Sequence, residues 1–231
     1  MKESSARSFQ PEALAFLSSL SRNNNREWFA EHKVDYEKLV LEPAFRFIEA
    51  MQKPLSKMAP QFVAVPKRVG GSLMRVHRDT RFSHNKSPYK TNIGIQFRHE
   101  QARDVHAPGF YVHVAPERTF IGAGMWRPDA TALRAIRERI VERPVEWRKA
   151  SRGGRFTQHF VLAGEQLLRP PRGFDKEHEF IDDIRRKDFI AICEFDPLAA
   201  IESGFQKAVE KGFKETLSYM EFLCRAVNVP F

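Results

Sequence analysis

The basic side chains between Lys67 and Lys90 are the part of this chain best suited to chemistry. Seven lysines and arginines stand there against one aspartate, a balance of +6, whereas all 231 residues carry only +9 (38 basic minus 29 acidic). A solubilising surface mixes both signs, and a long block of like charge is typical of a disordered tail. Leu73, Val76 and Phe82 add apolar anchors to this stretch, which predicts that it is folded and faces something anionic.

Residues 75–90, called the basic segment below, hold the candidate ligands. An arginine guanidinium donates paired hydrogen bonds to phosphate or carboxylate, a lysine adds a mobile charge, and a tyrosine hydroxyl can donate to the same anion. Asp79 is the expected counter-ion that orients neighbouring guanidinium groups. The predicted anion-binding residues are Arg75, Arg78, Arg81, Lys86, Tyr89 and Lys90.

An extended strand followed by a loop must position these side chains. Met74 and Val76 alternate with Arg75 and His77, which predicts a strand over residues 74–77 with its apolar side toward the core. Ser87 and Pro88 then favour a turn, so the later cations would lie on a loop that folds back over the earlier ones.

The chain as a whole predicts one α+β domain over residues 1–231. N-terminal helices, a central mainly antiparallel sheet and C-terminal helices packed on it are expected, with residues 9–60 helical, 68–126 strand-rich and 127–231 mixed. Short connections favour antiparallel pairing over parallel crossovers. Alternating apolar residues predict strands near residues 93–97, 110–114, 119–125 and 189–195.

Composition limits the class of protein. Mean hydropathy is −0.48 and no apolar run approaches the length of a membrane span, so no membrane partner is expected. The first residues lack the apolar run of a signal peptide. Cys193 and Cys224 lie far apart and outside any CxxC pair, which predicts buried, reduced thiols and a cytoplasmic location.

Motifs for metal or nucleophilic chemistry are missing from the sequence. No HExxH or CxxC pattern is found, so neither a metal nor another cofactor is predicted. No GxSxG elbow or Walker-type loop is present either. The catalytic residues are therefore unknown, and whether the protein is an enzyme stays open.

Four further side chains are candidates for lining a cleft beside the cations: Trp28, Tyr111, His113 and Trp126. Aromatic walls beside cations occur in proteins that bind single-stranded nucleic acid. The alternative is that the aromatic residues belong to the core, and that His113 is an ordinary solvent-facing or hydrogen-bonded histidine.

The basic segment also carries a recognisable pattern. It reads R-x-x-R-D-x-R-F-x-x-[DN]-K-x-x-Y, from Arg75 to Tyr89, and resembles the bacterial family catalogued as domain of unknown function 2461. Stretches at residues 23–29, 108–111, 122–128 and 171–174 are similar to the same family. The resemblance spans essentially the whole chain and implies that the basic segment is the family's signature. It implies no activity.

Three functions remain open at this point. The favoured one is binding of a phosphorylated or carboxylated small molecule by the basic segment. The second is nucleic-acid binding through the same cations, which a sequence pI of about 9.7 permits. The third is a structural or partner-binding module, in which the arginines form an ion-pair network with Asp79 and with Glu27 or Glu31.

Overall fold

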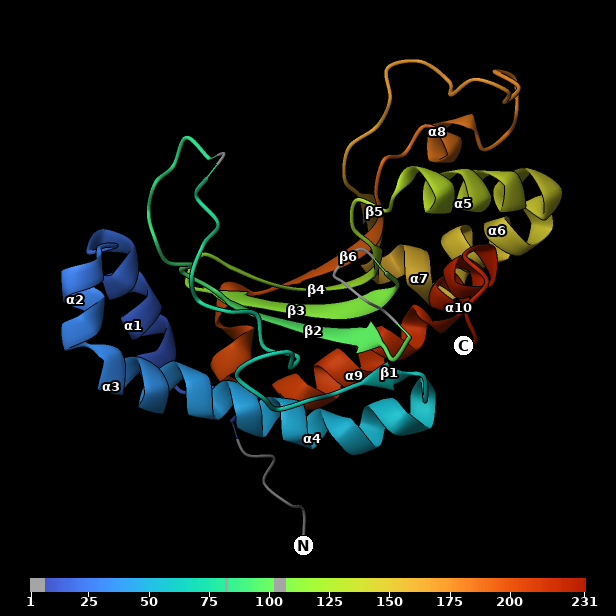
Figure 1. The fold of residues 1–231 in the computed structure, drawn as a ribbon. Helices are drawn as coiled ribbons and strands as arrows, with labels where there is room; N and C mark the ends of the chain where they lie inside the picture. Colours follow the sequence, from blue (N-terminus) through green and yellow to red (C-terminus); the bar gives the residue numbers. More distant parts are fainter. Residues whose placement is uncertain (1–6, 82, 102–106) are drawn as a thin grey trace, which may run out of the picture.

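The computed structural model describes residues 7–81, 83–101 and 107–231. Helices from both ends of the chain lie beneath and beside an antiparallel sheet of strand order β1-β2-β3-β4-β6-β5 (Figure 1). The predicted α+β class, with N-terminal helices, an antiparallel sheet and C-terminal helices, is confirmed.

Of the N-terminal helices, the first three lie at one end of the sheet and the fourth runs beneath it (Figure 1). Asn25 caps the second helix, because its side-chain oxygen accepts a hydrogen bond from the Trp28 amide at 2.9 Å. The helical elements are α1 (Pro11–Arg22), α2 (Arg26–Glu31), α3 (Lys33–Tyr36), a π-helical turn (Glu37–Leu41) and α4 (Glu42–Met58).

The sheet follows the alternation of the sequence. Its strands are β1 (Phe62–Val63), β2 (Ile93–His99), β3 (Gly109–Ala115), β4 (Arg118–Met125), β5 (Val161–Ala163) and β6 (Phe189–Phe195). The four longer strands lie where the sequence predicts them.

The C-terminal half adds helices beneath and beside the sheet. They are α5 (Ala130–Glu142), α6 (Pro144–Arg152), α7 (Gly154–His159), α8 (Ile181–Ile184), a 3-10 helix (Pro197–Ile201), α9 (Phe205–Glu215) and α10 (Leu217–Ala226). In the described part of the chain, no helix is both long and apolar enough to cross a membrane.

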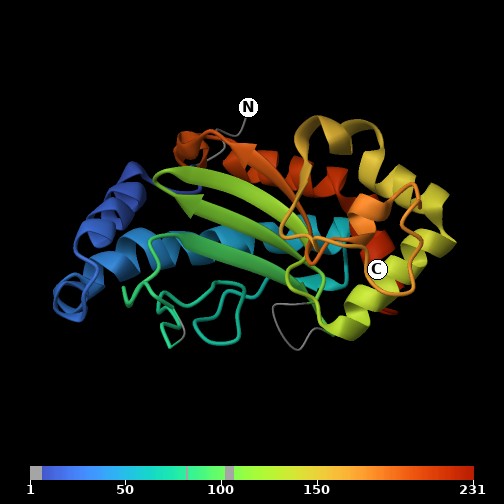
Figure 2. The ribbon, with the colours of Figure 1, turned by 90° about the horizontal axis from the view of Figure 1, so that it is seen from above.

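The two faces of the sheet differ. Ile121 faces α9 so closely that a Cβ on Gly212 would lie 2.2 Å from the Ile121 side chain. Gly94, His113 and Phe120 form a row across β2, β3 and β4 on the opposite face. Seen from above, no helix of the described residues lies over the middle of that face, which we call the open face (Figure 2). The basic segment rises beside one end of it and the connection from β5 to β6 beside the other (Figure 1).

Candidate functional site

Isolated bridges, rather than a continuous strand, hold the basic segment at the edge of the sheet. Leu73 pairs with Ile95 and His77 pairs with Tyr89. Four residue steps separate the first members of these pairs (77 − 73) and six separate the second (95 − 89), so two extra residues must bulge out of the ladder. The strand predicted over residues 74–77 is therefore wrong as a continuous element.

Asn24, in the turn between α1 and α2, fixes the end of the basic segment. Its side-chain oxygen accepts from the Tyr89 amide and its side-chain nitrogen donates to the Tyr89 carbonyl, both at 3.0 Å. The buried Tyr89 ring stacks on Phe29, with 4.0 Å between ring centroids. Tyr89 thus joins the basic segment to the N-terminal helices.

Two of the predicted cations have partners inside the basic segment. Arg81 donates to both carboxylate oxygens of Asp79, at 3.0 and 2.7 Å. These hydrogen bonds, helped by the more distant charge of Arg75, lower the pKa of Asp79 to about 2. Lys86 donates to the Thr80 carbonyl at 3.0 Å. Both contacts lie near the solvent-exposed tip of the segment.

The other three predicted cations have surroundings different from those of Arg81 and Lys86. Among the described residues, no carboxylate lies within 4.0 Å of the charged nitrogens of Arg75, Arg78 or Lys90. The side chain of Lys90 is half-buried, and burial lowers its pKa, with a smaller contribution from the nearby Arg75 charge. The Lys90 charge is therefore partly desolvated, and the charge of the exposed Arg75 lies near it.

The ion-pair network is small that would be required if the basic segment had only a structural or partner-binding role. Within the described ranges, neither Glu27 nor Glu31 makes an ion pair, and only Asp79 supplies a carboxylate to the basic segment. Phe82, an expected apolar anchor, lies outside the described residues.

A second group of side chains lies on the open face beside the basic segment. Tyr111 Oη and Asn92 Nδ2 lie 3.3 and 3.4 Å from His113 Nδ1. The imidazole stacks on Phe120 at 4.6 Å between centroids. Since Asn92 follows Lys90 by two residues, their Cα atoms are at most about 7 Å apart.

Burial keeps this group neutral at neutral pH. Desolvation, with the charge of Arg118 as the next cause, lowers the pKa of His113 to about 4. Desolvation also raises the pKa of Tyr111 to about 12. A neutral imidazole and a neutral phenol therefore share a half-buried position on a face with no covering helix in the described chain.

The two tryptophans predicted beside the cations are not part of this group. Trp28 stacks on His32 within the N-terminal helices, with centroids 4.0 Å apart. Trp126 follows β4, is half-exposed, and has the Arg127 guanidinium 5.0 Å from its ring centroid. Of the four candidates, Tyr111 and His113 are hydrogen-bonded neighbours, whereas the tryptophans belong to separate regions.

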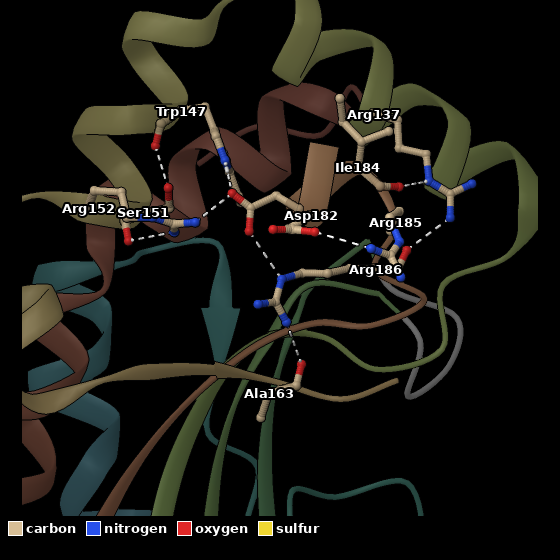
Figure 3. Close-up of polar contacts among 10 residues, drawn as sticks. Arg137, Trp147, Ser151, Arg152, Ala163, Asp182, Ile184, Arg185 and Arg186 are labelled. Carbon is tan, nitrogen blue, oxygen red and sulfur yellow. Dashed lines mark hydrogen bonds and ion pairs between the residues drawn. The ribbon is translucent and has the colours of Figure 1, made fainter. Parts of the chain in front are cut away.

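A buried carboxylate at the other end of the sheet was not identified from the sequence. Asp183, 1% exposed, accepts hydrogen bonds from Trp147 Nε1 at 2.7 Å and Arg152 Nη2 at 2.8 Å. Arg186 donates to its second oxygen at 3.2 Å and also reaches the Ala163 carbonyl (Figure 3). The spacing of Asp183 and Arg186, three residues apart, is the signal that could have indicated an ion pair.

This Asp183 network joins α6, α8 and the strand β5. Arg137 of α5 extends it, because its guanidinium donates to the Ile184 and Arg186 carbonyls at 2.7 and 2.9 Å (Figure 3). The acceptors named for the guanidinium groups of Arg137, Arg152 and Arg186 all belong to the protein itself. The network therefore fixes the architecture beside the open face and offers little to an external anion.

Comparison with known proteins gives a family match. The family model described as "Conserved hypothetical protein (DUF2461)" matches residues 12–222. No curated protein and no solved structure was found to match the chain. Among the described residues, no group of three or more His, Cys, Asp or Glu side chains could hold a metal ion.

Proposed function

The chain belongs to the DUF2461 family of conserved hypothetical proteins, and we propose that it binds a small phosphorylated or carboxylated molecule in the cytoplasm. Arg75, Arg78 and Lys90 hold the anion in this proposal. Asp79 orients Arg81 at the tip, while Lys86 and Tyr89 shape the segment around the site.

The observation that carries the proposal is the half-buried Lys90 beside Arg75, without a carboxylate partner among the described residues. Partial removal of a cation from water costs free energy, and a second cation nearby adds to that cost. An anionic ligand offsets both terms. On a surface that contacts only water, placing Lys90 in this half-buried position near Arg75 would bring no gain in free energy.

The two arginines supply the geometry that a lysine cannot. A guanidinium presents a planar set of donors that matches two oxygens of a phosphate or carboxylate. Arg75 and Arg78 have these donors uncommitted to any described carboxylate. Phosphate and carboxylate share this chemistry, so both belong to the proposed ligand class.

The test is titration calorimetry with inorganic phosphate and with citrate, on the wild type and Lys90→Met. We expect binding by the wild type and at least tenfold weaker binding by the variant. Lys207→Met is the matched control, because Lys207 is exposed on α9, beneath the sheet. Absence of binding by the wild type to either anion, or equal affinity of Lys90→Met, would overturn the proposal.

The same titration separates the nucleic-acid alternative. A single-stranded oligonucleotide that bound through these cations would lose affinity steeply as salt rises, because binding releases counterions. Tight, salt-sensitive oligonucleotide binding, lost in Lys90→Met and not displaced by phosphate or citrate, would assign the cations to nucleic acid instead.

A further inference from the structure

Gly94 creates space for a polar group on the open face. A Cβ at this position would lie 2.7 Å from Tyr111 Oη, 3.3 Å from Met74 Sδ and 3.4 Å from Asn92 Nδ2. A glycine inside a strand weakens it, and here the missing side chain leaves room for the hydroxyl and the amide to meet opposite His113. Three elements of the chain therefore converge on one small volume.

The hydrogen bonds among Asn92, Tyr111 and His113 do not use all of the donor and acceptor atoms of these side chains. Since the Asn92 amide and the Tyr111 hydroxyl approach His113 Nδ1, that nitrogen is the acceptor and Nε2 carries the ring hydrogen. His113 Nε2 has no partner among the described residues. Tyr111 Oη, which also has the Asn92 amide as a hydrogen-bond partner, keeps one further acceptor site, because a hydroxyl oxygen has two lone pairs.

Neutral groups of this kind suit a neutral polar ligand group. Desolvation holds both Tyr111 and His113 uncharged, so neither attracts an ion. An alkyl group over them would leave half-buried donors unpaired, which costs free energy. A hydroxyl both donates and accepts, and satisfies an Nε2 hydrogen and a phenol oxygen together.

We propose that Asn92, Tyr111 and His113 form a hydroxyl-binding subsite, which makes a phosphorylated polyol the preferred ligand class. This inference rests on the proposed function, because the phosphate of such a ligand would be held by Lys90 and Arg75. Asn92 follows Lys90 by two residues, so their Cα atoms are at most about 7 Å apart, a separation on the scale of a short polyol phosphate.

The experiment compares glycerol 3-phosphate with propyl phosphate, which has the same carbon chain without the hydroxyls. We expect the wild type to bind glycerol 3-phosphate about tenfold more tightly, the scale of one or two hydrogen bonds. Tyr111→Phe should reduce this preference several-fold while its affinity for inorganic phosphate stays unchanged. Tyr36→Phe, in the N-terminal helices, is the matched control and should keep the full preference.

A second variant tests whether a loss of preference comes from the subsite or from a change in folding. Gly94→Ala would place a methyl group against Tyr111 Oη, and we expect the same loss of preference; thermal unfolding of each variant reports whether the fold is kept. Equal wild-type affinity for the two phosphate esters, with inorganic phosphate still bound and Lys90-dependent, would overturn the subsite alone. Failure of all three compounds to bind would overturn the proposed function and the subsite together.

Discussion

Two groups of arginines in this protein have opposite surroundings. Arg152 and Arg186, at one end of the sheet, share the buried Asp183 carboxylate. Arg75 and Arg78, at the other end, have no carboxylate within ion-pair distance in the described chain. Arg186 belongs to the connection from β5 to β6, and Arg75 and Arg78 belong to the basic segment; both of these segments rise beside the open face (Figure 1). The role of an arginine cluster thus follows from the acids around it rather than from the number of cations.

The two groups of cations differ in what a substitution does to stability. Removing one member of a buried ion pair leaves the other charge desolvated and unpaired, which costs several kcal/mol. Removing an unpaired, half-buried cation relieves a desolvation cost instead. Substitutions at the two ends of the sheet should therefore change stability in different directions.

The largest effect is expected at the buried carboxylate. Asp183→Ala leaves Arg186, whose side chain is 12% exposed, without its partner, and also removes the acceptor of Trp147 Nε1. We expect a loss of about 3–5 kcal/mol in the free energy of unfolding, measured with urea. The neighbouring Asp182→Ala is the control, because Asp182 is 77% exposed and its pair with Arg185 should contribute less than about 1 kcal/mol. Similar losses in both variants would contradict the contrast between the two ends.

A smaller effect is expected where the basic segment joins the N-terminal helices. Asn24→Ala removes both hydrogen bonds to the Tyr89 backbone and should cost about 1–3 kcal/mol. The Tyr89 amide should then exchange with solvent faster in hydrogen-exchange experiments. Asn23→Ala, which removes an exposed bond to the Ser19 carbonyl, is the control. Unchanged exchange at Tyr89 would mean that Asn24 does not hold the segment.

The fold was largely predictable because apolar alternation is a local signal. Ile93, Ile95 and Phe97 alternate with smaller or polar residues, and β2 lies where they stand. The region before it was not predictable in the same way. Residues 74–77 alternate equally well, yet the extra residues on the partner side of the ladder reduce the pairing to isolated bridges. A bulge depends on both pairing partners, and the pattern of one of them cannot reveal it.

The candidate site, like the fold, has parts that the sequence predicts and parts that depend on the tertiary structure. The concentration of cations is visible in the sequence, whereas their separation into Arg81 with an acid and Arg75 without one depends on side-chain geometry. Tyr111 and His113 are two apart on one strand, so a shared face was predictable. The contribution of Asn92, which directly precedes the neighbouring strand β2, and the space made for it by Gly94 required the register of β2 against β3.

A near-zero effect on stability is expected at Lys90, in contrast with Asp183. Lys90→Met keeps the length of the side chain and removes a partly desolvated charge beside Arg75. Without ligand, the free energy of unfolding should stay within about 0.5 kcal/mol of the wild type or rise. A loss above about 2 kcal/mol would show that Lys90 holds the fold together, and would favour a structural role for the basic segment.

The last prediction concerns the pH dependence of stability. The pKa of His113 falls from 6.5 to about 4 in the folded protein, so between these values the unfolded chain binds a proton that the folded protein does not. The stability associated with the neutral imidazole is present above pH 6.5 and is lost as the pH falls toward 4. His113→Gln removes this proton uptake, so its urea midpoint should fall less than that of the wild type between pH 6.5 and 4. Parallel curves for the two proteins would mean that the imidazole is hydrated, and a hydrated imidazole would not need the hydroxyl of a ligand.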